Sequence, residues 1–161
     1  MQTFLPYSDF RASASALDRR RLGKQRVEAL QVLRGLVVAG YGWRRHPAVR
    51  MWAGYEEALV RYGLDVCAVW REQGHQDSCA TTLVADFAAF RPGAPVRRQE
   101  ELAAAGELPA WLGDHAFHLS HRSALVRKDP EVYAPLFPGV PADLPYVWPA
   151  SDPDDSAGGG G

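Results

Sequence analysis

Residues 14–38 have the periodicity of one long amphipathic helix, and this pattern limits what the chain can fold into. Apolar side chains recur three or four positions apart, which places them on one side of a helix: Leu22, Val27, Ala29, Leu30, Leu33, Leu36 and Val37. Ser13 or Ser15 is expected to cap the start of this helix, and Gly40 is expected to end it. The pattern predicts a helical protein organised around this segment.

A second stripe of the same helix is polar. Arg21, Lys24, Gln25 and Glu28 are spaced three or four apart and therefore share a face. Glu28 is one of only three acidic residues among the first fifty, and Lys24 is one of only two lysines in the chain. A carboxylate among so many cations is expected to stay ionised.

The remaining chain also has sequence patterns typical of helices, in segments bounded by glycine, proline and serine. We expect helices over residues 47–74, 78–90, 99–105 and 109–129, the last capped by Asp114, and an extended wrapping segment after Pro130. Residues 1–10 are too short and too broken by Pro6 to form a long helix. The sequence predicts an all-α fold, a compact bundle of three to five helices over residues 1–148, followed by a disordered acidic and glycine-rich tail over 149–161.

Charge is distributed unevenly along the chain. Residues 1–50 hold ten Arg or Lys and three Asp or Glu, a net charge of +7, whereas residues 51–161 have a net charge of −8. The basic first third is the kind of patch that attracts phosphates, although a solvated helix face is the alternative. Two cysteines without zinc-like spacing suit a reducing cytoplasm. We expect no signal peptide and no membrane span.

An amine beside a carboxylate can support imine chemistry at the sugar of a nucleotide. The amine attacks C1′, and the carboxylate positions the sugar and moves protons during base loss and strand elimination. Glu28 is the expected carboxylate. The amine is either the Met1 α-amine, whose intrinsic pKa is near neutral, or Lys24, one turn before Glu28. We expect Met1 to be retained because Gln2 is bulky. An ordinary surface ion pair between Lys24 and Glu28 is the alternative.

The order of these features resembles the pyrimidine dimer DNA glycosylase family, which includes phage endonuclease V, and in particular its small bacterial members. The resemblance runs from residue 1 to about residue 137. It is carried by Leu17-Asp18-Arg19, Leu22, Arg26-Val27-Glu28, His46-Pro47, the 115–128 helix and Asp129-Pro130 with Tyr133. It implies an all-α fold whose N-terminus threads between helices. It also implies a catalytic pair formed by an N-terminal α-amine and Glu28.

Double-stranded DNA with a damaged or modified base is the partner that these features predict, bound by a monomer without a cofactor. The expected phosphate contacts are Arg19, Arg20, Arg21, Arg26, Arg44 and Arg45, with Trp43 as a wedge and His46, His118 and Arg122 as further contacts. Trp43 as a core residue is the alternative. His115, His118 and His121 make a weak metal pattern, because a spacing of three drifts around a helix. Two other functions remain open: a non-catalytic nucleic-acid-binding module, and a small-molecule or metal enzyme that uses these histidines.

Overall fold

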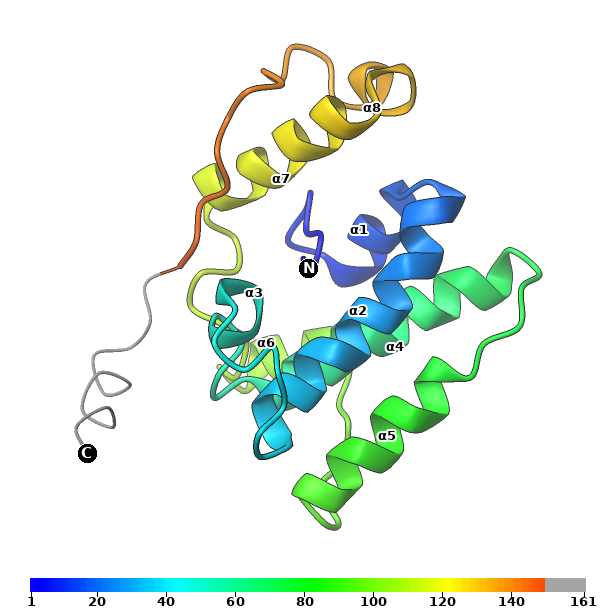
Figure 1. Cartoon of the computed structure of the whole chain (residues 1–161), viewed down its shortest axis with the longest axis vertical. Coiled ribbons are helices and arrows are strands. Elements are labelled where there is room, and N and C mark those ends of the chain that lie inside the picture. Colours follow the sequence, from blue (N-terminus) through cyan, green and yellow to red (C-terminus); the bar gives the residue numbers. More distant parts are fainter. Residues whose placement is uncertain (150–161) are drawn as a thin grey trace.

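The long amphipathic segment folds into two helices rather than one. In the computed structural model, which describes residues 1–149, α1 spans Phe10–Ala16 and α2 spans Arg19–Val37 (Figure 1). Asp18 separates them because its carboxylate accepts a hydrogen bond from the backbone N–H of Arg21 and so caps α2. The prediction of one helix over 14–38 was therefore wrong at its start.

The predicted serine caps were also wrong. Asp9 caps α1 by accepting a hydrogen bond from the N–H of Ala12 at 2.7 Å. Ser13 is buried inside α1, where its hydroxyl bonds both the N–H and the C=O of Tyr7. Each aspartate satisfies a free N–H at a helix start, a role that Ser13 cannot fill from within the helix.

The all-α prediction is confirmed for residues 1–149, which contain eight helices. The others are α3 (Pro47–Arg50), α4 (Glu56–Glu72), α5 (Cys79–Phe90), α6 (Gln99–Ala104), α7 (His115–Lys128) and α8 (Pro130–Leu136). The number exceeds the predicted three to five partly because Gly54, with φ of +84°, divides the expected 47–74 helix. Asp129 caps α8, so residues 130–136 are helical and not extended as predicted. The predicted tail lies outside the described residues from 150 onward.

Helices α2 and α4 form the centre of the fold, and α5 packs against both of them. A Cβ at Gly63 in α4 would lie 2.8 Å from Cδ1 of Leu83 in α5 and 3.2 Å from Cβ of Ala29 in α2. Only glycine allows the three helices to approach this closely, and α4 continues through Gly63 without a break. Trp52 and Tyr62, from the segment predicted as a helix over residues 47–74, are fully buried and form part of the core.

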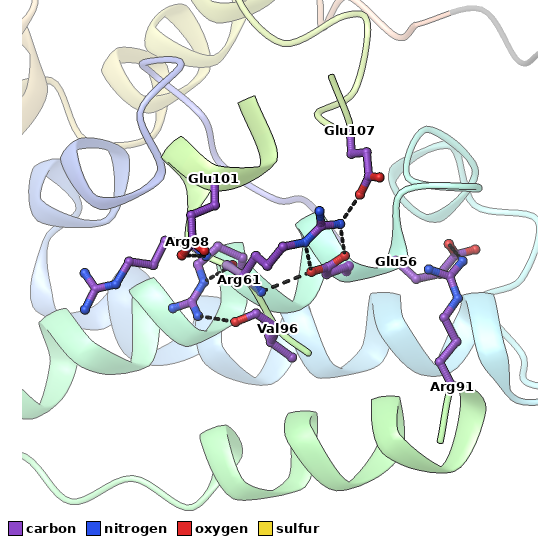
Figure 2. A network of polar contacts seen from close by, with 9 residues as sticks. Glu56, Arg61, Arg91, Val96, Arg98, Glu101 and Glu107 are labelled. Atoms are coloured by element: carbon purple, nitrogen blue, oxygen red, sulfur yellow. Dashed lines mark hydrogen bonds and ion pairs between the residues drawn. The ribbon is translucent and has the colours of Figure 1, made fainter. Parts of the chain in front are cut away.

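Ion pairs hold the loop between α5 and α6 against α4 (Figure 2). The Arg61 guanidinium donates to the carbonyl oxygens of Val96, at 3.0 Å, and Arg97, at 2.8 Å. Arg97 in turn binds both carboxylate oxygens of Glu57, at 3.0 and 2.9 Å. These contacts tether an irregular, proline-containing loop to α4.

Candidate active site

The first six residues lie inside the protein as an extended segment, with the N-terminus between α2 and α7 (Figure 1). Gln2, Thr3, Phe4 and Leu5 are all buried. This arrangement agrees with the threaded N-terminus that the family resemblance implies. An extended segment without a neighbouring strand needs other partners for its backbone polar groups, and side chains of the surrounding helices supply them.

Gln25 of α2 clamps the backbone just after Met1. Its side-chain oxygen accepts a hydrogen bond from the N–H of Phe4 at 3.0 Å, and its side-chain nitrogen donates to the C=O of Gln2 at 2.7 Å. Gln25 is 1% exposed and lies one turn before Glu28. The same helix therefore fixes both the chain that carries the α-amine and the carboxylate.

Two histidines of α7 hold the other side of the segment. Nδ1 of His121 accepts from the N–H of Leu5 at 2.9 Å, and Nδ1 of His118 donates to the C=O of Leu5 at 2.8 Å. Nε2 of His118 accepts from the N–H of Gly113 at 2.9 Å, which fixes its tautomer. Arg122 donates to the C=O of Pro6 at 2.7 Å. His118 and Arg122 were predicted to contact DNA; we correct this for His118, because it is buried and both of its ring nitrogens are occupied within the protein.

We expect these histidines to make stability depend on pH. Burial lowers the pKa of His121 to about 3, with a smaller effect from the charge of His118, and burial also lowers the pKa of His118. The unfolded chain binds the proton with a pKa of about 6.5, so this stability is present above pH 6.5 and is lost as pH falls toward 3. For His121 alone, the free energy of unfolding should fall by about 2 kcal/mol between pH 7.5 and pH 5.

Urea denaturation at the two pH values measures this difference. His121→Gln should flatten the pH dependence, whereas the control His115→Gln should leave it unchanged, because His115 is exposed. An unchanged pH dependence in His121→Gln would contradict the assignment.

A cavity of about 350 Å³ opens beside this segment and brings the predicted catalytic residues together. Met1, Lys24 and Glu28 all line it, together with Gln2, Phe4, Arg20, Arg21, Lys128 and Tyr146. The Glu28 side chain is only 12% exposed, and its Oε1 lies 3.7 Å from Nζ of Lys24. The Lys24 side chain is 74% exposed. The cavity thus holds a sheltered carboxylate, a chain-terminal amine and an exposed lysine.

A row of aromatic side chains continues outward from Tyr146, which lines this cavity and lies 5.5 Å from the Trp148 ring. The His46 ring lies 5.8 Å from the Trp43 ring and 6.2 Å from the Trp148 ring, edge-on to both. Nδ1 of His46 accepts from the N–H of Ala48 at 3.0 Å and so caps α3. Burial, and then the positive charge of the Met1 amine, lower the pKa of His46. His46 is thus close enough to the amine to be affected by its charge.

The predicted DNA-contacting arginines fall into two groups. Arg19, Arg20, Arg44 and Arg45 are exposed, and Arg44 and Arg45 line a second cavity of about 820 Å³ with Arg50. Arg21 and Arg26 are committed to acidic partners instead. Arg21 lies 3.0 Å from Asp18, and the Arg26 side chain is 16% exposed, with its guanidinium 2.5 Å from Asp77 and 4.5 Å from the Trp70 ring. Trp43 is 47% exposed and is not part of the core.

The family model for pyrimidine dimer DNA glycosylases matches residues 1–83. The chain belongs to this family. Residues 1–83 of this family member contain Met1, Gln25, Glu28 and His46. The sheltered carboxylate and the threaded N-terminus therefore lie within the matched part of the chain. Membership implies a DNA substrate. No curated protein and no solved structure matches the chain significantly.

Some site residues of this family member escape sequence reasoning. Gln25 was visible on the polar stripe, but nothing in the sequence indicates that it binds the backbone of residues 2 and 4. Tyr146 and its neighbour Trp148 come from the C-terminal segment, which lies far along the sequence from the matched residues 1–83.

No group of three or more histidine, cysteine or acidic side chains within residues 1–149 is arranged to hold a metal. In the same range, no helix is long and apolar enough to cross a membrane.

Proposed function

We propose that this pyrimidine dimer DNA glycosylase family member removes a damaged pyrimidine and then cleaves the strand at the abasic site. The observation that supports this most directly is the shared cavity of Met1 and Glu28. The Met1 α-amine is the proposed nucleophile and Glu28 the proposed acid–base group. Lys24 is the second candidate amine, but its side chain is mostly in solvent.

The reaction begins when the amine lone pair forms a bond to C1′ of the sugar. The bond between C1′ and the base breaks, and the base leaves with the bonding electrons and a proton. The sugar ring opens to an imine, which draws electrons from C2′. Glu28 supports these proton movements, including removal of the C2′ proton, and the 3′ phosphate leaves by elimination. Water then hydrolyses the imine and frees the amine.

Exposed cations in the first fifty residues support duplex binding. Arg19, Arg20, Arg44 and Arg45 are the proposed phosphate contacts, and the reacting nucleotide must leave the base stack for its C1′ to reach the amine. We propose that the protein acts as a monomer, with residues 1–148 as one helical domain. Two cysteines that form no disulfide support a reducing, cytoplasmic setting.

Borohydride trapping on DNA with one abasic site tests the proposal and identifies the amine. The wild-type protein should form a covalent adduct, and mass spectrometry of the trapped peptide should place it on Met1. Lys24→Ala is the matched variant and should trap as well as wild type. An adduct on Lys24 would keep the reaction class but overturn the α-amine assignment. DNA binding without any adduct would favour a non-catalytic binding module.

A further inference from the structure

We propose that the acidic residues after Pro149 bind to the arginine-lined cavity beside α3 of the same chain and compete there with the phosphates of DNA. These residues, 150–155, are called the acidic segment below. The competition rests on the proposed DNA substrate, whereas the contact itself does not. The charge of the cavity, the free arginines that line it and the point where the described chain ends support the contact.

The cavity of about 820 Å³ carries a concentrated positive charge. Arg44, Arg45 and Arg50 line it, and no acidic residue does. Within residues 1–149, none of these three guanidinium groups takes part in an ion pair. Like charges that line one cavity repel one another, and an anion that binds among them relieves the repulsion. The cavity is therefore suited to an anionic ligand.

The described chain ends close to this cavity. The ring of Trp148 lies 6.2 Å from the ring of His46, which lies between Arg45 and α3 and caps that helix. Just before this point, the N–H of Val147 donates to the Ser120 hydroxyl at 3.1 Å, which fixes the chain to α7. Figure 1 shows the chain before residue 150 passing from α7 toward the side of α3. The acidic segment therefore starts near the arginines.

The length and composition of the acidic segment fit this site. Asp152 is three residues beyond Pro149 and Asp155 is six residues beyond it, so extended backbone gives a reach of about 10 to 20 Å. The segment has three aspartates and no basic residue, a net charge of −3. It has little apolar surface to bury, so its attraction to the folded chain is electrostatic. Its three carboxylates match the three free guanidinium groups.

Competition with DNA follows from the proposed phosphate contacts. Arg44 and Arg45 belong to both sets, and a guanidinium that pairs with a carboxylate is less available to a phosphate. Because the contact is intramolecular, the aspartates are present at an effective concentration in the millimolar range. DNA must displace the acidic segment before it can use these arginines, so the segment lowers the affinity for DNA.

Two variants with the same net charge separate this contact from a general effect of charge. The first replaces the three aspartates of the acidic segment by asparagine: Asp152→Asn, Asp154→Asn and Asp155→Asn. The control replaces three exposed acidic residues that do not line the cavity: Glu100→Gln, Glu131→Gln and Asp143→Asn. In about 50 mM salt, binding to a fully paired duplex should tighten about 3- to 30-fold in the first variant, the range expected for three exposed ion pairs, and less than about twofold in the control.

Amide signals of glycines in the cavity test the contact without DNA. In NMR spectra of ¹⁵N-labelled protein in about 50 mM salt, the signals of Gly40 and Gly42, which line the cavity, should differ between wild type and the first variant. The difference should disappear in about 1 M salt, where charges are screened beyond about 3 Å. The signals of Gly106 and Gly113, which do not line the cavity, should not change.

Unchanged signals of Gly40 and Gly42, or an equal gain in DNA affinity in the control variant, would overturn the proposal. A signal difference that grows with protein concentration would also overturn it, because it would place the acidic segment on a second molecule. The outcome is separable from that of the proposed function. A wild-type protein that binds no duplex and forms no borohydride adduct would reject the DNA substrate and with it the competition, and the glycine signals would then decide the contact alone.

Discussion

Glu28→Gln is expected to reduce base release and strand cleavage by about 10²- to 10⁴-fold, the contribution typical of a positioned acid–base group. Glutamine has nearly the same shape but cannot accept a proton at neutral pH. The fold should tolerate the change, because the ion pair with Lys24 is worth less than about 1 kcal/mol at a 3.7 Å separation with an exposed lysine. Single-turnover cleavage of DNA with one abasic site measures the effect.

Two controls separate catalysis by Glu28 from other causes. Glu100→Gln removes an exposed carboxylate from α6 that does not line the cavity, and should leave the rate unchanged. Lys24→Gln removes the partner of Glu28 and should slow the reaction less than about threefold. A Glu28→Gln enzyme with near wild-type rate would remove Glu28 from the mechanism, and a Lys24→Gln enzyme as slow as Glu28→Gln would transfer the nucleophile to Lys24.

Gln25→Leu is expected to lower both stability and rate, because Gln25 positions the chain that carries the amine. Leucine leaves the buried N–H of Phe4 and the buried C=O of Gln2 without their partner, and each unpaired group costs about 1–3 kcal/mol. We expect the free energy of unfolding to fall by about 2 kcal/mol or more and kcat to fall at least about tenfold. Urea denaturation and steady-state cleavage of abasic-site DNA measure the two effects.

The division between kcat and KM distinguishes positioning from general damage to the fold. The exposed arginines that we propose to bind DNA make no contact with Gln25, so KM should change little. Gln25→Glu keeps an acceptor for Phe4 and should recover part of the rate. The control Gln31→Leu changes a half-buried glutamine two turns later on α2 and should keep a normal kcat. A fall in stability with an unchanged kcat would show that Gln25 supports the fold alone.

The sequence predicted correctly those features that depend on interactions between residues a few positions apart. The three- and four-residue periodicity of residues 14–38 reports backbone geometry within α2, and Asp114 caps α7 as predicted. Lys24 and Glu28 share a face for the same reason, whatever surrounds them. The break before α2 was missed, because serine and aspartate compete as caps and only the full structure shows that Ser13 bonds Tyr7.

The candidate site depends on contacts between residues far apart in sequence. The placement of Met1 follows from Gln25 on α2 and from the histidines on α7, whose pattern in the sequence is equally consistent with a solvent-facing stripe. Tyr146 reaches the same cavity only because α7 binds the C-terminal segment. The sequence by itself determined the helices and the pairing of Lys24 with Glu28, since periodicity acts over a few residues. Tertiary structure decided that Met1 lines the same cavity as Glu28, because the buried backbone of residues 2–6 takes its hydrogen-bond partners from the packed helices α2 and α7.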